Sequence, residues 1–187
     1  LDESKAFDFI VHTHGILVPV VIATLLYQAY FEYSSFIWLA AVSVGMSSGA
    51  SGIITAHELG HRRPRSRSWW LSRLDLMCVL YLHFTVEHNH THHKHWAKPK
   101  DPTSSPWKRN VYVHFIRTIP LQLMGAYRAK PKDFRYSMLI QLLLLVTLLI
   151  ISPVLLGVFL LQALVAIFLL EFVNYLQHHG LVRGVVD

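Results

Sequence analysis

Two segments of this sequence place histidines at spacings that suit metal binding. His57 and His61 lie four residues apart in the run HELGH, and His88 and His92 repeat that spacing, with His93 next in the chain. Residues i and i+4 of a helix share a face, so each pair can direct two imidazoles toward one ion. Histidine also stands at positions 90 and 95, so the second segment holds enough imidazoles for two neighbouring metal ions.

A third histidine segment, NYLQHHG at 174–180, follows the last apolar stretch of the chain. Polar neighbours of the histidine segments are candidates for orienting metal ligands from outside the coordination sphere, and they are Glu58, Glu87 and Asn174. No catalytic side chain is predicted beyond the metal ligands. The spacing leaves open the roles of His90, His95, His179 and Glu171.

The ligand types restrict which metal the sequence can hold. The chain has 13 histidines but a single cysteine, Cys78, which excludes Cys-based zinc and iron–sulfur sites. Histidine with nearby carboxylates suits iron, copper, zinc or nickel. Two adjacent ions beside a membrane fit oxygen activation on a di-iron centre, whereas zinc would imply hydrolysis. HExxH is also a zinc-protease signature, so an intramembrane protease stays an alternative.

Composition indicates that the elements carrying these histidines are membrane helices. Of 187 residues, 53% are hydrophobic and only 15% are charged, against roughly 25% in soluble proteins. Aromatic residues make up 12% of the chain, which argues against disorder. The sequence therefore predicts an all-α integral membrane protein.

Four apolar stretches predict two transmembrane hairpins, one at 16–33 and 36–56 and the other at 135–151 and 153–176. Pro153 divides the second pair, and Gly45 and Gly49 in the first give the small-xxx-small spacing of closely packed membrane helices. Of the 17 Lys and Arg residues, 15 lie in the intervening segment 57–134 or at its edge, at Arg135. By the positive-inside rule this segment and 177–187 are cytoplasmic.

The segment between the hairpins is expected to lie at the membrane boundary. Residues 71–86 are apolar but contain charges, so an interfacial or re-entrant helix is predicted there rather than a fifth span. All three histidine segments then meet at one depth on one side of the membrane. Histidines outside them are expected to be interfacial or loop residues, and these are His12, His14, His83 and His114.

The motifs themselves resemble a known family. HELGHRR at 57–63, EHNHTHHK at 87–94, PKDPTSS at 99–105 and NYLQHHGLVR at 174–183 look like the bacterial alkane 1-monooxygenases. These are integral membrane di-iron hydroxylases of the fatty acid desaturase and hydroxylase group. The resemblance covers most of the chain. It implies that six histidines are iron ligands, namely His57, His61, His88, His92, His93 and His178.

The resemblance also implies an activity. It predicts hydroxylation of the terminal carbon of n-alkanes to primary alcohols, with two iron ions, O2 and electrons from rubredoxin. The expected partners are rubredoxin, the apolar substrate and membrane lipids, with no nucleic acid. The expected location is the bacterial inner membrane, with the site facing the cytoplasm.

The chain begins at Leu1 and lacks the family's further LQRHxxHH box. It is therefore expected to be a fragment of a six-helix membrane domain, and to be inactive alone.

Two positions depart from the family motif NYxEHYG, because Gln177 replaces Glu and His179 replaces Tyr. Gln at that place is similar to the xylene-type methyl hydroxylases, which keeps methyl-aromatic hydroxylation open as an alternative. A fatty-acyl desaturase is a more distant alternative. A membrane metal-binding or transport protein is the non-enzymatic one, although histidines gathered at one membrane face disfavour transport.

Overall fold

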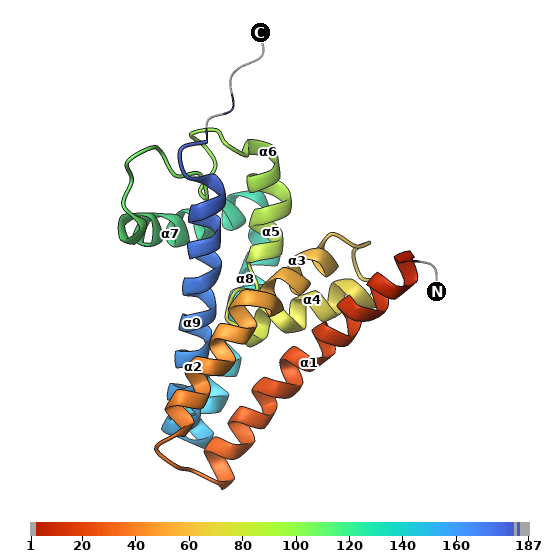
Figure 1. Cartoon of the computed structure of the whole chain (residues 1–187), viewed down its shortest axis with the longest axis vertical. Coiled ribbons are helices and arrows are strands. Elements are labelled where there is room, and N and C mark those ends of the chain that lie inside the picture. Colours follow the sequence, from red (N-terminus) through yellow and green to blue (C-terminus); the bar gives the residue numbers. More distant parts are fainter. Residues whose placement is uncertain (1–2, 182, 184–187) are drawn as a thin grey trace. The chain divides into compact units, whose positions relative to one another are not determined.

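The computed structural model describes residues 3–181 and 183, and its regular structure is helical (Figure 1). Within those residues no strand forms, and an isolated bridge joins Ser105 to His179. The helices, in chain order, are α1 (Glu3–Phe31), α2 (Ile37–Ser47), η1 (Ser48–Gly52), α3 (Ile53–Gly60), α4 (Arg67–Cys78), α5 (Phe84–Glu87), η2 (His88–His92), α6 (His93–His95), α7 (Val111–Ala129), α8 (Pro131–Ile151) and α9 (Pro153–His178). The prediction of an all-α fold is confirmed.

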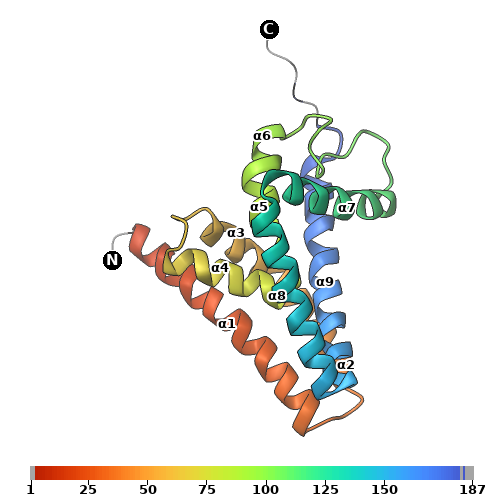
Figure 2. The ribbon, with the colours of Figure 1, turned by 180° about the vertical axis from the view of Figure 1, so that it is seen from behind.

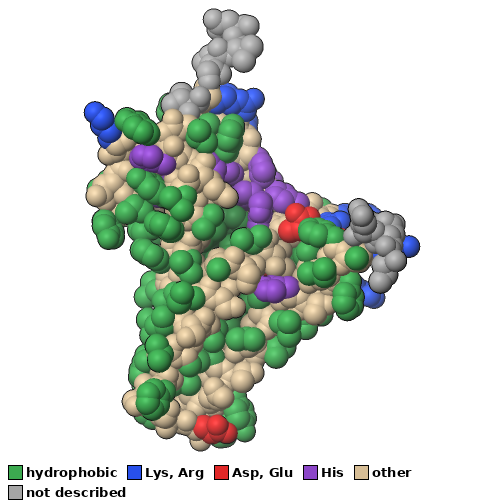
Figure 3. All heavy atoms as spheres, in the orientation of Figure 1, with side chains coloured by type: hydrophobic (Ala, Val, Ile, Leu, Met, Phe, Trp, Pro, Cys, Tyr) green, Lys and Arg blue, Asp and Glu red, His purple; other side chains and the backbone are tan. Residues whose placement is uncertain are grey.

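Four helical stretches are long and apolar enough to cross a membrane, at Lys5–Phe31, Ile37–Gly60, Pro131–Ile151 and Pro153–His178. In the view of Figure 3, no acidic or basic side chain lies over the middle of α1 or α2. Large apolar side chains such as Leu39 and Ile150 are exposed on these helices, as expected of lipid-facing surface. The chain is therefore a membrane protein.

The described chain forms two compact units. One contains the residues up to Leu82 together with Ile140–Ile167, and the other contains His83–Leu139 and the residues from Phe168 onward. Helices α8 and α9, separated by Ser152 alone, contribute to both units (Figure 2).

The first unit is built around an apolar core with a helical repeat. Val18, Ile22, Leu25 and Ala29 of α1 recur at intervals of three and four residues, which aligns them on one face of the helix. They pack with buried residues of the other helices, namely Ile37, Ala41, Leu148, Leu155, Val158 and Phe159. The core thus packs α1, α2, α8 and α9 together through apolar side chains.

A close helix–helix approach occurs at Gly45, one of the small residues noted in the sequence. A Cβ at this position would lie 2.5 Å from the carbonyl oxygen of Gln162 and 2.7 Å from Cβ of Val165. We expect Gly45→Ala to lower the thermal unfolding temperature of the purified protein, because overpacking costs about 1–3 kcal/mol.

Gly125→Ala is the matched control for that variant. It adds the same methyl group where the nearest atoms lie at an ordinary 3.5 Å. A Gly→Ala change inside a helix, where the methyl group fits, is worth up to about 1 kcal/mol of stabilisation. Unchanged unfolding of the Gly45→Ala variant would contradict the close packing of α2 on α9.

The predicted helix over 71–86 is wrong in its extent. Ser66 begins α4 by accepting a hydrogen bond from the Trp69 backbone N–H at 3.2 Å. The helix ends at Cys78, and Leu80 then takes a positive φ of 57°. A turn therefore separates α4 from α5, which hydropathy alone does not indicate. Among the described helices, α4 is not one of the candidate spans.

Asp75 of α4 makes folding sensitive to pH. Its side chain is buried, and neither carboxyl oxygen has a hydrogen-bond partner within the described residues. Burial raises the pKa of Asp75 from 3.8 to about 8. The folded chain therefore holds a proton that the unfolded chain loses between these values, so stability falls as pH rises through this window.

We expect Asp75→Asn to remove this loss of stability, since the amide stays neutral. Its unfolding temperature should match that of the unchanged protein near pH 4 and exceed it at pH 9, by about 2–4 °C for each kcal/mol recovered. Thermal unfolding across this pH range measures the difference. A constant difference at all pH values would contradict the assignment to Asp75 ionisation.

Candidate metal centre

The first histidine pair lies at the end of α3, in the first unit. Nε2 of His57 and Nε2 of His61 are 2.8 Å apart, and their ring centroids are 4.6 Å apart. The α-helical i, i+4 spacing therefore aims both nitrogens at one point, as predicted from the sequence. The preceding turn, η1, is π-helical and rich in small residues.

Glu58, a predicted orienting residue, takes part in a charge network beside this pair. Its Oε1 lies 3.6 Å from the guanidinium of Arg62, which also donates to Asp8 at 2.6 Å. These side chains are partly exposed, so the pairs contribute little to folding stability. The network links the end of α3 to the start of α1.

Four imidazoles cluster in the second unit. The ring of His88 lies 5.0 Å from that of His92 and 4.4 Å from that of His93, between centroids. His92 is also 5.1 Å from His178 of α9. Three of these rings lie within the six residues His88–His93, and the fourth, His178, follows His93 by 85 positions. The structure thus unites the second and third histidine segments.

The turn that carries this cluster is a π-helix rather than the α-helix that the sequence predicts. The backbone N–H of His93 donates to the carbonyl of His88, an i to i+5 bond. Because the turn is wider, His93 lies closer to His88 than His92 does. π-Helical turns occur frequently at functional sites.

A buried carboxylate fixes the orientation of His92. Asp101 Oδ1 lies 3.0 Å from Nδ1 of His92, and the Thr103 hydroxyl lies 2.7 Å from the same nitrogen. The Thr103 backbone N–H and the Ser104 hydroxyl donate to the carboxylate at 3.1 and 2.8 Å. With Nδ1 engaged as the donor to Asp101, Nε2 carries the lone pair and is the nitrogen that could bind a metal.

The charge of Asp101 is maintained by its surroundings. Burial alone would favour the neutral acid, but the hydrogen bond and charge of His92 and the hydroxyls of Ser104 and Thr103 outweigh it. The pKa of Asp101 therefore lies below its usual range. An ionised carboxylate at Nδ1 makes the other imidazole nitrogen a stronger ligand.

His178 is oriented by its own helix. Its Nδ1 donates to the backbone carbonyl of Asn174 at 2.7 Å, which makes Nε2 the nitrogen that could bind a metal. The Asn174 side chain donates to Glu171 at 3.4 Å, and Gln122 of α7 donates to the same carboxylate at 3.1 Å. Asn174, predicted to be an orienting residue, thus contacts both a ring and a buried acid.

Glu87 supplies a second buried carboxyl group next to the cluster in sequence. Its side chain is fully buried, and neither oxygen has a hydrogen-bond partner within the part of the chain described. Burial, followed by the negative charges of Asp101 and Glu171, raises its pKa to about 8. A nearby cation would stabilise the ionised form of these buried carboxyl groups, so the surroundings of the four rings fit a metal ion.

The remaining histidines lie outside the cluster. His90 binds the Val86 carbonyl through Nδ1 at 3.1 Å, and with His95 it lines a separate groove. His179 packs its ring 4.7 Å from that of Tyr175.

His83 lies in the turn before α5 and His114 lies on α7, and both side chains are buried. Burial and then the charge of Arg109 lower the pKa of His114 to about 4, so the ring is neutral.

His12 and His14 connect α1 to its neighbours. His12 Nε2 lies 2.9 Å from the Ser68 hydroxyl on α4, and His14 Nδ1 lies 3.0 Å from the Thr55 hydroxyl on α3. Both residues therefore have structural contacts within the first unit.

Sequence reasoning missed polar residues that surround the clustered histidines, above all Asp101 and Thr103 beside His92 and Gln122 beside Glu171. The DPTSS run contains a signal for the first two, because an Asp followed by hydroxyl residues two and three positions later favours a local side-chain-to-backbone turn. Its connection to His92 nine residues earlier carries no such signal. Gln122 pairs with an acid 49 positions away.

Comparison with known proteins gives a consistent set of relatives. The family model for fatty acid desaturase matches residues 33–186. Alkane 1-monooxygenase 1 of Alcanivorax borkumensis is 31% identical over 188 residues, which cover 89% of this chain and 46% of the relative. Alkane 1-monooxygenase 1 of Pseudomonas aeruginosa is 32% identical, and the match covers 89% of this chain and 49% of the relative. The chain spans about half the length of the curated relatives it matches.

Proposed function

Because the chain belongs to the fatty acid desaturase family, we propose that the gene product carrying it is a membrane monooxygenase that hydroxylates the terminal carbon of n-alkanes. The motif resemblance to alkane 1-monooxygenases is confirmed by the relatives of that name. In the reaction a terminal C–H bond is replaced by C–OH. One atom of O2 enters the alcohol, and the other leaves as water with two protons and two electrons from a donor.

The observation that carries this proposal is the four-imidazole cluster of His88, His92, His93 and His178. It lies in the unit that begins after the first two candidate spans, with two rings oriented through Nδ1. Oxygen chemistry needs a redox-active metal, and imidazole ligands suit iron. We take two iron ions as the cofactor, which would supply the activation of O2.

The proposed ligands are these four histidines together with His57 and His61. The first pair is assigned to the same centre on the motif resemblance. The role of the chain's other residues is to hold those rings: Asp101 and Thr103 orient His92, and the Asn174 carbonyl orients His178. The substrate would enter the site from the bilayer, because alkanes partition into lipid. The apolar segments 36–56 and 153–173 would exclude water from the site.

The proposed electron donor is rubredoxin, a small acidic protein, arriving from the cytoplasmic side of the inner membrane. If basic residues of 62–135 dock it, reduction should slow as ionic strength rises, because exposed charges are screened beyond about 8 Å at 0.15 M salt. Stopped-flow reduction between low and high salt measures this. A reduction rate that does not change with salt concentration would contradict electrostatic docking of rubredoxin.

Substrate profiling tests the activity against its neighbours. The gene product, in membranes with its donor, is supplied with octane, p-xylene and acyl lipids, and products are identified after incubation with ¹⁸O2. We expect labelled 1-octanol as the main product. Labelled methylbenzyl alcohol as the main product would favour the xylene-type reading, and an unsaturated acyl chain without label would favour a desaturase.

Metal content separates the enzyme from a metal-binding or transport protein. We expect iron to be the dominant bound metal, with the Mössbauer signal of two coupled ions. Zinc in its place, or transport of a metal across vesicles without oxygenated product, would overturn the monooxygenase proposal.

A further inference from the structure

Helix α7 has its polar and apolar faces inverted relative to a water-exposed helix. His114, Thr118, Gln122 and Ala126, four residues apart, are fully buried. The opposite face exposes large apolar side chains to 44–76% of their surface, and these are Tyr112, Val113, Ile116, Met124 and Tyr127. Exposed apolar surface of this extent marks an interaction site.

The basic residues of α7 follow one edge of that apolar face. At about 100° per residue, Arg117 and Arg128 fall within about 20° of one another, between the apolar and the buried faces. A helix with an apolar face, cations at its edge and tyrosines at both ends has the pattern of one lying in a membrane interface.

Chain connectivity places the end of α7 at the membrane. Only Lys130 separates α7 from α8, which is one of the candidate spans. Because α8 is a candidate span and carries Lys132 and Arg135 in its first turns, the preceding helix ends close to the bilayer surface. Within the described residues α7 is not itself a candidate span, so it can lie along that surface.

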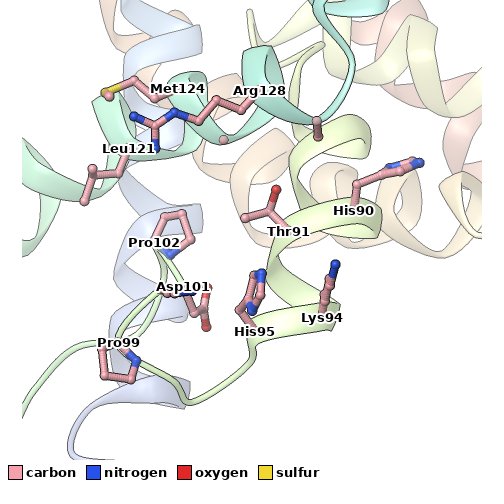
Figure 4. A pocket seen from close by; sticks show the side chains of 13 residues that line it. His90, Thr91, Lys94, His95, Pro99, Asp101, Pro102, Leu121, Met124 and Arg128 are labelled. Carbon is pink, nitrogen blue, oxygen red and sulfur yellow. The ribbon is translucent and has the colours of Figure 1, made fainter.

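A groove of about 630 Å³ adjoins the basic edge of α7 (Figure 4). Leu121, Met124 and Arg128 of α7 form one side, while Thr91 and His95 face them across it. Two further cations, Lys94 and Lys100, line the groove, as does His90. Asp101 is the one acid among its lining residues, and its carboxylate is occupied by His92, Thr103 and Ser104.

We propose that α7 lies in the membrane interface on its apolar face and that the groove beside it binds the headgroup of an anionic phospholipid. The three cations suit a phosphate group, and Leu121 and Met124 continue from the groove to the apolar face, where acyl chains would lie. Lys130 directly before α8, and Lys132 and Arg135 in its first turns, add three cations after the end of α7. The site does not depend on the metal or on the reaction.

Spin labelling tests the position of α7. A nitroxide is attached at Ile116→Cys in a Cys78→Ser background, and at exposed Lys98→Cys as the control, with the full chain in phospholipid nanodiscs. We expect the label at position 116 to collide more often with O2 than with a water-soluble nickel chelate, and the control label to show the reverse. Preference for the chelate at position 116, or protection from both reagents by a covering protein, would overturn the proposal.

Lipid titration tests the groove. In detergent, phosphatidylglycerol should raise the unfolding temperature, whereas phosphatidylcholine and inorganic phosphate should not. Combining Lys94→Gln, Lys100→Gln and Arg128→Gln should raise the half-maximal phosphatidylglycerol concentration by at least about tenfold. The control, Lys5→Gln with Arg63→Gln and Arg67→Gln, removes the same charge from the first unit and should leave it unchanged.

Three outcomes would overturn the headgroup site. An equal response to inorganic phosphate would assign the groove to free anions. An equal loss of phosphatidylglycerol affinity in the control variant would show that the response depends on net charge and not on the groove. Slower reduction by rubredoxin with an unaltered phosphatidylglycerol response would assign the groove to an acidic protein partner.

Discussion

We expect the His92→Ala variant to lose its bound metal and, with it, hydroxylation of octane. His92 is buried, lies 5.0 Å from the ring of His88 and 5.1 Å from that of His178, and is held by Asp101. Removing an outer partner of a ligand costs about 10–100-fold in metal affinity or activity, so removing the ligand itself should cost more than about 100-fold. Iron content by mass spectrometry and product formation by gas chromatography measure the two losses.

His90→Ala is the matched control, because it removes an imidazole from the same π-helical turn. The His90 ring binds the Val86 carbonyl and lines the groove instead of joining the cluster. We expect this variant to retain iron and most of its activity. Equal loss in both variants would show that the turn, rather than the ring of His92, is what the substitution disrupts.

The second large effect is expected at Asp101, which orients His92 without being a proposed ligand. Asp101→Asn keeps the size of the side chain and an oxygen that can accept from Thr103, but it removes the charge beside Nδ1. We expect about a 10–100-fold loss of iron affinity, with an equal loss of turnover at limiting iron. Iron titration of the apoprotein, followed by activity at saturating iron, separates the two.

A positioning role predicts more than weaker binding. In the apoprotein, ¹⁵N chemical shifts of His92 should show the Nδ1–H tautomer, and Asp101→Asn should increase the Nε2–H form. Asp133→Asn, on the exposed start of α8, is the control and should change neither property. An unaltered tautomer together with weakened binding would contradict orientation through the Asp101 carboxylate.

The membrane helices could be predicted well because their signal is local. Runs of apolar residues near 20 positions long indicate a span whatever the rest of the chain does. The helix ends are less predictable. The helix over the first apolar run begins at Glu3, well before residue 16, because residues 3–15 mix polar and apolar side chains and hydropathy does not register them.

The candidate site divides in the same way. The i, i+4 spacing of His57 and His61 predicts convergence on one point, and their Nε2 atoms are 2.8 Å apart. The same argument is incomplete for His88, His92 and His93. A π-helical i to i+5 bond there depends on packing around the turn, and no spacing rule indicates it.

Residue types and spacing therefore determine that this chain forms apolar helices with imidazoles grouped on short segments. They do so because helical periodicity and hydropathy depend on neighbours within a turn or two. The partners of those imidazoles come from tertiary structure. Asp101 contacts His92 because the loop that carries it folds back toward that ring. Gln122 donates to Glu171, which lies 49 positions later in the sequence. Such pairs form only when packed helices bring distant segments together. Buried polar groups are then excluded from water and form hydrogen bonds with one another.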